Sequence, residues 1–399
     1  MKIAVIGGGV AGLAAAGSAT GASVVLFEHS DKVGKKIYIT GKGRCNFTNV
    51  CDAETFLTNV VTNAPFLRSA LSKLSPDDAV ALLERNGCKT KTERGRRAFP
   101  QSDKASDVTK ALLRYAQSNG ADIRLDSRLT DIAPDNNGFT VKYVGGKEFF
   151  DRVIICTGGL SYPQTGSDGS AHALIEKLGH KIVEPVPSLV ALDIKERMPA
   201  AEGLTLKNIA LSADGIKPIF GDLMVTDSGI SGPVVLTLSA YAARRAKPYT
   251  VWLDFKPAMS EDELDARILR DFSQRLNKQF KNSLDELLPK SIIRYIINRS
   301  GIAESRQVNS ITKEERRALA RLLKKFPLTV IGGEGFERAV VTCGGVDVKQ
   351  VNPKTMESRI VRGLYFGGEV LDVDALTGGY NFHIALATGY AAGSAAAAE

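Results

Sequence analysis

Cysteine is scarce in this sequence, and no two cysteines form a paired motif. The spacing of the five contains no CxxC, which excludes the common disulfide frameworks and zinc-ligand patterns. We therefore predict no metal site and expect four of the five thiols to be reduced and buried. The five are Cys45, Cys51, Cys88, Cys156 and Cys343.

Long hydrophobic runs are also missing. No apolar stretch reaches the roughly eighteen residues that a membrane span requires. The chain begins directly with a strand-like segment and not with a signal peptide. We therefore expect no membrane association and a cytoplasmic location. Aromatic residues make up only 7% of the sequence, so platforms for base stacking are not conspicuous.

The composition that remains is that of a globular protein. Hydrophobic residues make up 44% and charged residues 24% of the 399 positions. This length exceeds what a single core usually supports, so two or three domains are expected. The formal net charge of +8 permits an anionic partner such as a nucleotide or RNA without demonstrating one.

The first thirty residues carry a nucleotide-binding pattern. An apolar strand, a glycine turn, an alanine-rich helix and a second apolar strand follow one another, with GxGxxG at Gly7, Gly9 and Gly12. Gly9 would let a pyrophosphate approach the backbone, and the helix N-terminus would supply amide donors. Glu28 ends the second strand, where a carboxylate would accept a hydrogen bond from a ribose. This pattern predicts dinucleotide binding.

The rest of the chain divides by composition. A helix is predicted over 104–119, with Ser102 or Asp103 as its cap, and a buried strand over 153–159 that returns beside the first strand. Two prolines within 185–187 mark a boundary, because proline interrupts both helices and strands. We predict a discontinuous nucleotide-binding domain of 1–187 and 340–399, a β-rich domain of 188–256 and 326–339, and a helical insert of 257–325.

Positive charge concentrates in two places. The helical insert contains 15 Lys/Arg and 10 Asp/Glu, a net +5, and residues 89–97 contain five Lys/Arg and one Glu, a net +4. Apolar stripes in the insert run through Leu264, Ile268, Leu269, Phe272 and Leu276, and through Ile292, Ile293, Tyr295 and Ile296. The basic residues fit either phosphate contacts or ordinary solvated helix faces.

Seven sequence blocks make the pattern specific. They are GGGVAGLAAA, VGKKIYITGKGRCNFTN, RRAFPQSDKASDV, TGGLSYPQTGSDG, SGISGP, TCGGVDV and PKTMESRIVRGLYFGGEVLDVDALTGGYNF. In this combination the chain resembles, over essentially its whole length, a bacterial flavoprotein family. That family includes BaiN-type oxidoreductases, aminoacetone oxidase, and RdsA-type enzymes that reduce a uridine of large-subunit ribosomal RNA to dihydrouridine. The resemblance implies an α/β fold: a glutathione-reductase-like FAD-binding Rossmann domain with an inserted β-rich domain and a helical lobe.

The resemblance also implies residues that hold non-covalent FAD. The loop 39–49 would wrap the cofactor past its pyrophosphate and reach toward the isoalloxazine; the alternative is a solvated basic turn. Asn381 is predicted beside the flavin pyrimidine edge, and His383 is expected to be packed. The full predicted set is Gly7, Gly9, Ala11, Gly12, Glu28, Lys35, Lys36, Gly43, Arg44, Cys45, Asn46, Leu129, Thr157, Gly158, Gly159, Gly368, Glu369, Asp372, Gly379, Tyr380, Asn381 and Phe382.

Three residues are candidates for proton transfer or substrate contact. Cys45 lies beside Arg44, whose charge would favour a thiolate, although the sequence slightly favours a packing role for it. Tyr162 and Asp227 lie in the TGGLSYPQTG and TDSGISGP segments. Many family members carry histidine where this chain has Asp227, which puts in doubt any mechanism that needs an imidazole there.

Two classes of function remain open. No CxxxxC follows the first motif, which argues against a disulfide reductase. Residues 332–339, GGEGFERA, lack the strand and helix of a second nucleotide domain, so NAD(P)H would bind only transiently as the reductant. We expect an FAD-dependent, NAD(P)H-linked oxidoreductase whose acceptor is a ribosomal RNA uridine, contacted through 89–97 and the helical lobe. The alternative is a small-molecule flavoenzyme, either an amine or ketone oxidase or an enone reductase.

Overall fold

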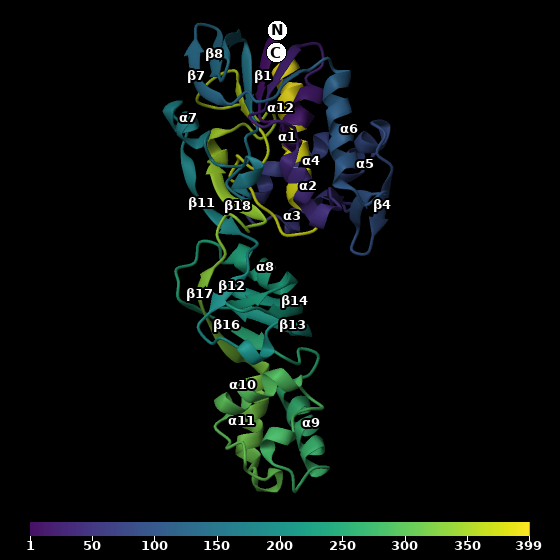
Figure 1. Cartoon of the computed structure of the whole chain (residues 1–399), viewed down its shortest axis with the longest axis vertical. Helices are drawn as coiled ribbons and strands as arrows, with labels where there is room; N and C mark the ends of the chain where they lie inside the picture. Colours follow the sequence, from purple (N-terminus) through teal and green to yellow (C-terminus); the bar gives the residue numbers. More distant parts are fainter. Residues whose placement is uncertain (399) are drawn as a thin grey trace. The chain divides into compact units, whose positions relative to one another are not determined.

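The computed structural model describes residues 1–398, and the chain divides into two compact units. The first unit combines Met1–Ser188 with the segment that begins at Phe336, and the second is the intervening Leu189–Gly335. Within the first unit, the N-terminal strand and the C-terminal helix lie together, in purple and yellow in Figure 1. The two ends of the chain therefore build one body.

A five-stranded parallel sheet forms the centre of the first unit, in the order β19-β10-β1-β2-β6. Strand β1 pairs with β10, which confirms the predicted return of the chain beside the first strand. The predicted α/β class is confirmed as well, since β19 joins the sheet from the far end of the sequence. The strands are β1 (Lys2–Ile6), β2 (Ser23–Phe27), β6 (Asp122–Arg124), β10 (Arg152–Ile155) and β19 (Leu364–Phe366).

Two small-residue helices pack against each other beside this sheet. They are α1 (Val10–Ser18) and α12 (Tyr380–Ala398). A Cβ added at Gly389 would lie 2.2 Å from the carbonyl oxygen of Ala11, and one at Gly393 would lie 2.1 Å from that of Ala15. Glycine is therefore required at both positions, because only a residue without a side chain lets the two backbones approach so closely.

Smaller sheets and helices complete the first unit. Two three-stranded sheets have the orders β3-β5-β4 and β7-β8-β9, and β11 pairs with β18. These strands are β3 (Thr48–Asn49), β4 (Thr90–Glu93), β5 (Arg97–Pro100), β7 (Leu129–Asp135), β8 (Gly138–Tyr143), β9 (Gly146–Phe150), β11 (Ile182–Ser188) and β18 (Val341–Val346). The helices are α2 (Lys35–Ile39), α3 (Ala53–Thr58), α4 (Arg68–Lys73), α5 (Pro76–Arg85), α6 (Ala105–Ser118) and α7 (His172–Lys177).

The second unit contains a closed six-stranded barrel and a group of helices. The barrel order is β12-β15-β14-β13-β16-β17. The strands are β12 (Leu192–Ile194), β13 (Thr205–Ala213), β14 (Ile216–Val225), β15 (Gly229–Ser231), β16 (Tyr249–Asp254) and β17 (Phe326–Gly333). The helices are α8 (Pro233–Tyr241), α9 (Glu261–Ser273), α10 (Lys290–Ser300) and α11 (Lys313–Lys324). Among residues 1–398, no helix has both the length and the apolarity needed to cross a bilayer.

Three local predictions were wrong. The prolines do not interrupt the strand, because β11 continues through Pro185 and Pro187 and its register against β18 shifts between Val183 and Val186, around Pro185; the two units nevertheless divide directly after them, between Ser188 and Leu189. Leu276 is 52% exposed because α9 ends at Ser273, before the predicted stripe does, and Leu269 is also exposed. Neither Ser102 nor Asp103 caps α6, since Lys104 occupies the cap position without a side-chain bond.

Candidate functional site

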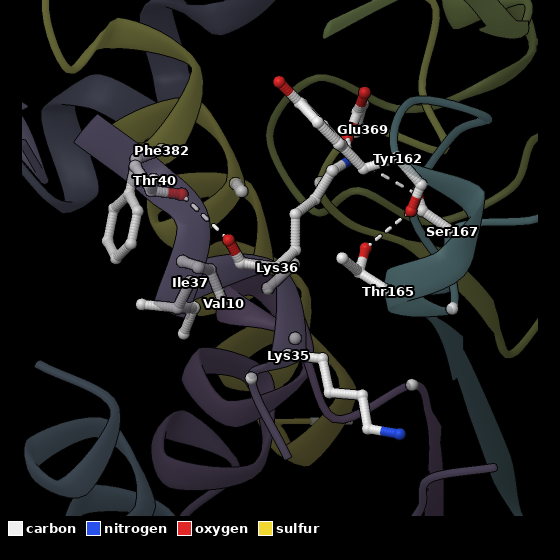
Figure 2. A pocket seen from close by; sticks show the side chains of 18 of the residues that line it. Val10, Lys35, Lys36, Ile37, Thr40, Tyr162, Thr165, Ser167, Glu369 and Phe382 are labelled. Atoms are coloured by element: carbon white, nitrogen blue, oxygen red, sulfur yellow. Dashed lines mark hydrogen bonds and ion pairs between the residues drawn. The ribbon is translucent and has the colours of Figure 1, made fainter. Parts of the chain in front are cut away.

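A cavity of about 880 Å³ lies within the first unit. Most of its wall comes from four stretches far apart in sequence: the β1–α1 turn, α2 with the loop that follows it, the segment after β10, and the turns between β19 and α12. Residues 27–29, 127–129 and 340–341 complete the lining together with Arg97 and Phe99. Figure 2 shows side chains from these stretches facing one space. A chamber of this size with a mixed polar and apolar lining is typical of a site for a cofactor-sized molecule.

The glycines of the β1–α1 turn differ in what requires them. Gly7 has φ +104°, and a Cβ there would lie 2.5 Å from the carbonyl oxygen of Cys156. A Cβ at Gly12 would lie 1.8 Å from the carbonyl oxygen of Gly7. Gly9, the N-cap of α1, has φ −80°, and a Cβ there would meet no protein atom within 4 Å. The fold requires Gly7 and Gly12, whereas the glycine at position 9 leaves open space on the cavity wall.

Glu28 directly follows β2 and holds the glycine turn in place. Its Oε2 accepts a hydrogen bond of 2.8 Å from the Gly8 N–H, and its Oε1 accepts one of 2.8 Å from the Ser30 N–H. The residue is 7% exposed and lines the cavity. A carboxylate oxygen has a second lone pair, so each can still accept from a bound hydroxyl.

The turn that leads into α12 forms another part of the wall. Gly378 and Gly379 have φ of +130° and +97°, and both line the cavity. Asn381, predicted to lie beside the flavin pyrimidine edge, lines the cavity, but its amide group is hydrogen-bonded to the preceding turn. Its Nδ2 donates to the Ala375 carbonyl at 2.6 Å and its Oδ1 accepts from the Ala375 N–H at 2.9 Å. The side chain thus fixes the preceding turn, while the first-turn N–H groups of the helix lack intrahelical partners.

The loop 39–49 lines the cavity as well, but its arginine is engaged elsewhere. Gly41, Lys42 and Asn46 face the cavity together with Arg44. Arg44 pairs with Glu93 Oε1 at 2.5 Å and with Asp103 Oδ1 at 2.6 Å. These two carboxylates compensate the guanidinium charge and raise its pKa. Arg44 was predicted to hold FAD. Glu93 and Asp103 compete with the anionic groups of the cofactor for its guanidinium.

Cys45 is not the thiolate that the sequence suggested. Its side chain is fully buried, and it does not line the cavity. Burial raises the pKa of the Cys45 thiol far above its ordinary value, and Cys88 adds to the effect. The neighbouring Arg44 does not offset this, because its charge is directed at Glu93 and Asp103. The structure supports the packing alternative for Cys45.

Two buried polar atoms of cavity-lining residues fit a site for a ligand with hydrogen-bonding groups. Within residues 1–398, Asn46 Oδ1 and Thr157 Oγ1 have no hydrogen-bond partner. Both residues line the cavity. Buried polar atoms in native proteins nearly always have a partner, and leaving one unsatisfied costs about 1–3 kcal/mol. A bound molecule with hydrogen-bonding groups would satisfy both atoms.

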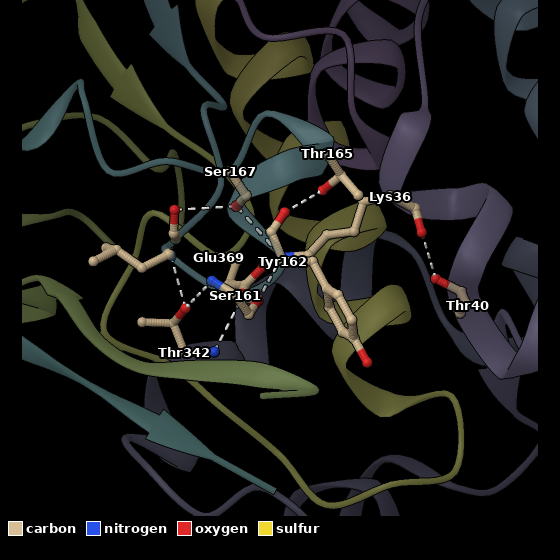
Figure 3. A network of polar contacts seen from close by, with 10 residues as sticks. Lys36, Thr40, Ser161, Tyr162, Thr165, Ser167, Thr342 and Glu369 are labelled. Atoms are coloured by element: carbon tan, nitrogen blue, oxygen red, sulfur yellow. Dashed lines mark hydrogen bonds and ion pairs between the residues drawn. The ribbon is translucent and has the colours of Figure 1, made fainter. Parts of the chain in front are cut away.

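A compact polar network centres on Glu369 (Figure 3). Lys36 Nζ lies 2.6 Å from Glu369 Oε2 and donates to Ser161 Oγ at 2.6 Å. Glu369 Oε1 accepts from Ser161 Oγ at 2.6 Å and from the Thr342 N–H at 2.8 Å. Burial acts to raise the pKa of Glu369, but the charge of Lys36 and these hydrogen bonds outweigh it and lower the pKa. The carboxylate is therefore ionised and joins four segments of the cavity wall.

Tyr162 lies on the cavity wall in a strained backbone conformation. Its φ is +52°, a left-handed value that costs a bulky residue about 1–2 kcal/mol. Hydrogen bonds hold it there: its N–H donates to the Phe336 carbonyl at 2.9 Å, and its carbonyl accepts from Thr165 Oγ1 at 2.8 Å. The phenol ring extends away from the polar network in Figure 3, and no described residue hydrogen-bonds its hydroxyl. Strain of this kind is typical of functional positions.

The structure brings most of the predicted cofactor residues together. Those that line the cavity are Gly7, Gly9, Ala11, Glu28, Lys35, Lys36, Arg44, Asn46, Leu129, Thr157, Gly158, Gly368, Glu369, Gly379, Asn381 and Phe382. Gly12, Gly43, Cys45, Gly159, Asp372 and Tyr380 do not line it. Among these, Tyr380 packs edge-on against Phe56, and a Cβ at Gly159 would lie 2.5 Å from Thr342 Oγ1. Asp227 is an exposed residue of the second unit, between β14 and β15.

Sequence reasoning missed several polar residues of the site. Ser161 and Ser167 lie in the quoted TGGLSYPQTGSDG block, but a serine in a glycine-rich turn carries no signal of its own. Thr342 accepts hydrogen bonds from the N–H groups of Leu160 and Ser161. Its partners are about 180 residues away in sequence, so only the folded chain reveals this contact.

Comparison with known proteins places these features in a wider group. Residues 1–395 match the family described as HI0933-like protein Rossmann domain. The chain is 33% identical to a 3-dehydro-bile acid delta(4,6)-reductase of Clostridium scindens, over 99% of both chains. It is also 33% identical to a ribosomal RNA dihydrouridine synthase of Haemophilus influenzae, over 97% of this chain and 96% of the other.

Solved structures support the fold. The crystal structure of 3-ketosteroid-delta4-(5alpha)-dehydrogenase from Rhodococcus jostii RHA1, in complex with 4-androstene-3,17-dione, matches with a TM-score of 0.54. The match covers 99% of this chain and 96% of that one at 14% identity. At that identity the similarity concerns the fold alone.

Proposed function

This chain belongs to the HI0933-like Rossmann family, and from that premise we propose that it uses NAD(P)H to reduce a uridine of large-subunit ribosomal RNA to dihydrouridine. The coarser part of this statement is established: the chain is an FAD-dependent oxidoreductase. The nucleic-acid substrate is the proposal. It rests on the relative named as a ribosomal RNA dihydrouridine synthase, and it implies a cytoplasmic location.

The cavity fits FAD. Its wall offers the open space in front of Gly9, the unpartnered Asn46 Oδ1 and Thr157 Oγ1, and the N-terminal turns of α1 and α12. Helix N-termini attract phosphates and other anionic groups through their free N–H groups. We propose that Gly7–Gly9 and α1 hold the pyrophosphate, and that Glu28 accepts from the ribose. FAD supplies hydride transfer between NAD(P)H and the substrate when it is bound.

The reduction requires one hydride and one proton. The hydride adds to one carbon of the uridine C5=C6 bond and the proton to the other, while NAD(P)H becomes NAD(P)⁺. We propose that the Tyr162 hydroxyl delivers that proton, because it lines the cavity and has no hydrogen-bond partner among residues 1–398. Cys45 does not serve, since its thiol is buried and its pKa is raised. Solvent would then return a proton to Tyr162.

One observation carries the choice of a polyanionic substrate. Arg97, the last residue of the basic 89–97 region, lines the cavity, and so does Phe99, two residues further along β5. Positive charge from the basic region therefore reaches the site itself. The direct test is deletion of the gene followed by mass spectrometry of ribosomal RNA. We expect one large-subunit position that is dihydrouridine in the wild type to stay uridine in the deletion strain, which makes that nucleotide lighter by the mass of two hydrogens. An unchanged spectrum would contradict the proposal.

A second candidate has an observation in its favour. The relative that reduces a bile acid is as similar to this chain as the RNA-modifying one, at 33% identity. In that case the cavity would accept a conjugated enone, and salt would have little effect on turnover. Anaerobic stopped-flow reoxidation of the reduced protein separates the two, since an enone reductase reoxidises with a small enone in the absence of RNA. Rapid reoxidation by oxygen alone would indicate an oxidase instead.

A further inference from the structure

We propose that the tip of the β4–β5 hairpin is a phosphate-binding surface that guides an RNA strand to the mouth of the cavity. The tip consists of Arg94, Gly95, Arg96 and Arg97. This inference rests on the proposed function. The sequence predicted RNA contacts along the whole 89–97 segment and the helical lobe. The structure limits the proposed contacts to the guanidinium groups of Arg94, Arg96 and Arg97, and Asn49 connects this turn to the cavity wall.

The hairpin presents its arginines to solvent in a fixed arrangement. Glu93 of β4 lies opposite Arg97 of β5 in the ladder, and Arg94, Gly95 and Arg96 form the turn between them. Gly95 and Arg96 have positive φ values, +76° and +59°. Arg97 Nε donates to the Arg94 carbonyl at 3.1 Å, which ties the two ends of the turn together. All three arginines are exposed. The turn therefore presents the three side chains from one short stretch of backbone.

The charge of the tip is not compensated within the protein. The neighbouring Lys91 pairs with Asp103, and Glu93 is held by Arg44, so the acid of the hairpin faces inward. None of the three tip arginines forms an ion pair with a described residue. Arg96 contributes weakly to the low pKa of Asp52, which is lowered chiefly by hydrogen bonds from Thr55. Exposed guanidinium groups without partners bind phosphates in a bidentate manner.

The tip continues directly into the cavity wall. Arg97 and Phe99 of β5 both line the cavity. The Arg44 guanidinium lies 4.4 Å from the Phe99 ring centroid, and that of Arg97 lies 5.8 Å from it. A strand rises about 3.3 Å per residue, so Arg96 and Phe99 are on the order of 10 Å apart. One RNA strand can span that distance with a phosphate at the tip and a base at the cavity.

A buried asparagine links the tip to the glycine turn at the start of α12. Asn49 Nδ2 donates to the Gly95 carbonyl at 3.0 Å and, more weakly, to the Gly378 carbonyl at 3.4 Å. The Val50 N–H donates to the Arg96 carbonyl at 2.8 Å. Gly378 lines the cavity, so one amide group contacts both the phosphate-binding turn and the cofactor wall. RNA bound at the tip would therefore alter the surroundings of the flavin through Asn49.

The helical lobe is the weaker candidate for this role. Of its 15 Lys/Arg, eight form ion pairs, including the two-bond contact of Arg316 with Asp265 at 2.7 and 3.0 Å. These pairs join the helices of the lobe to one another and to the barrel. A paired guanidinium must give up a carboxylate before it binds a phosphate, which lowers its contribution to RNA affinity.

The test compares two charge-matched triple variants of the FAD-loaded protein. The first is Arg94→Gln, Arg96→Gln and Arg97→Gln. The control is Lys73→Gln, Arg85→Gln and Lys110→Gln, which removes three exposed cations of the same unit that do not line the cavity. The probe is a fluorescein-labelled oligouridine, and its affinity is followed by anisotropy across a potassium chloride series.

We expect the tip variant to bind the probe more weakly and with a smaller salt dependence. Each phosphate contact to a single strand contributes about 0.7 to the slope of log K against log salt, so losing three lowers the slope by about 2. The control should keep the wild-type slope. Equal slopes for the wild type and the tip variant would overturn the inference, as would an equal loss in the control. Either result leaves the proposed function to the ribosomal RNA mass spectrum, which tests it separately.

A separate measurement tests the link that Asn49 forms between Gly95 and Gly378. We expect the probe to change the flavin fluorescence of the wild type. Asn49→Ala and Asn49→Leu should bind the probe as the wild type does but lose this change. Asn49→Leu keeps the approximate size of the side chain without adding charge and removes its hydrogen-bonding groups, so it serves if the alanine variant is unstable. A full flavin response in a folded Asn49 variant that binds RNA would overturn the coupling.

Discussion

Lys36 Nζ lies 2.6 Å from Glu369 Oε2, although 333 residues separate the two in the sequence. Neither side chain is more than 29% exposed. The pair joins α2 to the segment after β19, and Ser161 and Thr342 bring in two further segments. One ion pair therefore holds together the parts of the chain that form the cavity.

We expect Lys36→Met to destabilise the protein by about 3 kcal/mol, because it leaves Glu369 buried without its cation. FAD affinity should fall as well, since the cavity wall loses its bracing. Chemical denaturation of the FAD-free protein and a fluorescence titration with FAD measure the two effects. The double variant Lys36→Met/Glu369→Gln should recover part of the stability, because the charge and its partner are removed together. Additive losses in the double variant would contradict this account.

The glycines at positions 9 and 12 should respond to alanine in opposite ways. Gly9→Ala should leave the stability of the FAD-free protein within about 1 kcal/mol of the wild type, because its φ suits alanine and its Cβ meets no protein atom. FAD affinity should fall about tenfold or more, since the methyl group enters the cofactor space. Gly12→Ala should lose about 3 kcal/mol or more of stability, because its Cβ overlaps the Gly7 carbonyl. Unchanged FAD binding in Gly9→Ala would refute the pyrophosphate assignment.

Stability should fall on acidification because of His383. The imidazole is fully buried between Thr48 Oγ1 and the Leu74 carbonyl, and burial lowers its pKa from 6.5 to about 4. Below pH 6.5 the unfolded chain binds a proton that the folded chain does not take up until about pH 4. The contribution is therefore present above pH 6.5 and is lost toward pH 4, at a total of about 3 kcal/mol.

Two variants test this pH dependence: His383→Gln removes the imidazole, and Thr48→Val is its control. His383→Gln should flatten the dependence of unfolding free energy on pH between about 4 and 6.5. Thr48→Val keeps the imidazole and should keep the slope. Denaturation series at several pH values provide the comparison, and an unaltered slope in His383→Gln would assign the acid sensitivity to other groups.

Tyr162→Phe should slow the transfer to substrate and spare the earlier steps. Loss of a positioned proton donor typically costs about 10²–10⁴-fold in rate. FAD affinity and anaerobic reduction by NAD(P)H should remain close to those of the wild type, because only the hydroxyl is removed. Stopped-flow measurement of the two half-reactions separates them.

Cys45→Ala is the control for that experiment. The thiol is buried and its pKa is raised, so we expect no alkylation of Cys45 in the folded protein and little change in the transfer step. A large loss of rate in Cys45→Ala with normal transfer in Tyr162→Phe would reverse the two assignments.

Local sequence patterns predicted many of the strands, turns and helices of this structure. The glycine spacing of residues 7–12 predicts a strand, a turn and a helix because each requirement lies within one turn of backbone, and the alternation of apolar residues marks the sheet strands. The same locality explains the failures. Leu276 follows the apolar period but lies beyond the end of α9, and Pro185 is tolerated because β11 has an irregular register there.

The sequence by itself determined that a nucleotide-binding α/β fold forms from both ends of the chain, since the glycine motifs and apolar strands encode it locally. Only the tertiary structure decided what each charged or polar group does. Arg44 forms ion pairs with Glu93 and Asp103, and Lys36 forms one with Glu369. Asn381 hydrogen-bonds the preceding turn, and Cys45 is buried away from the cavity. The physical reason is that hydrogen bonds and ion pairs act over a few ångströms, and which groups come that close depends on contacts between residues hundreds of positions apart.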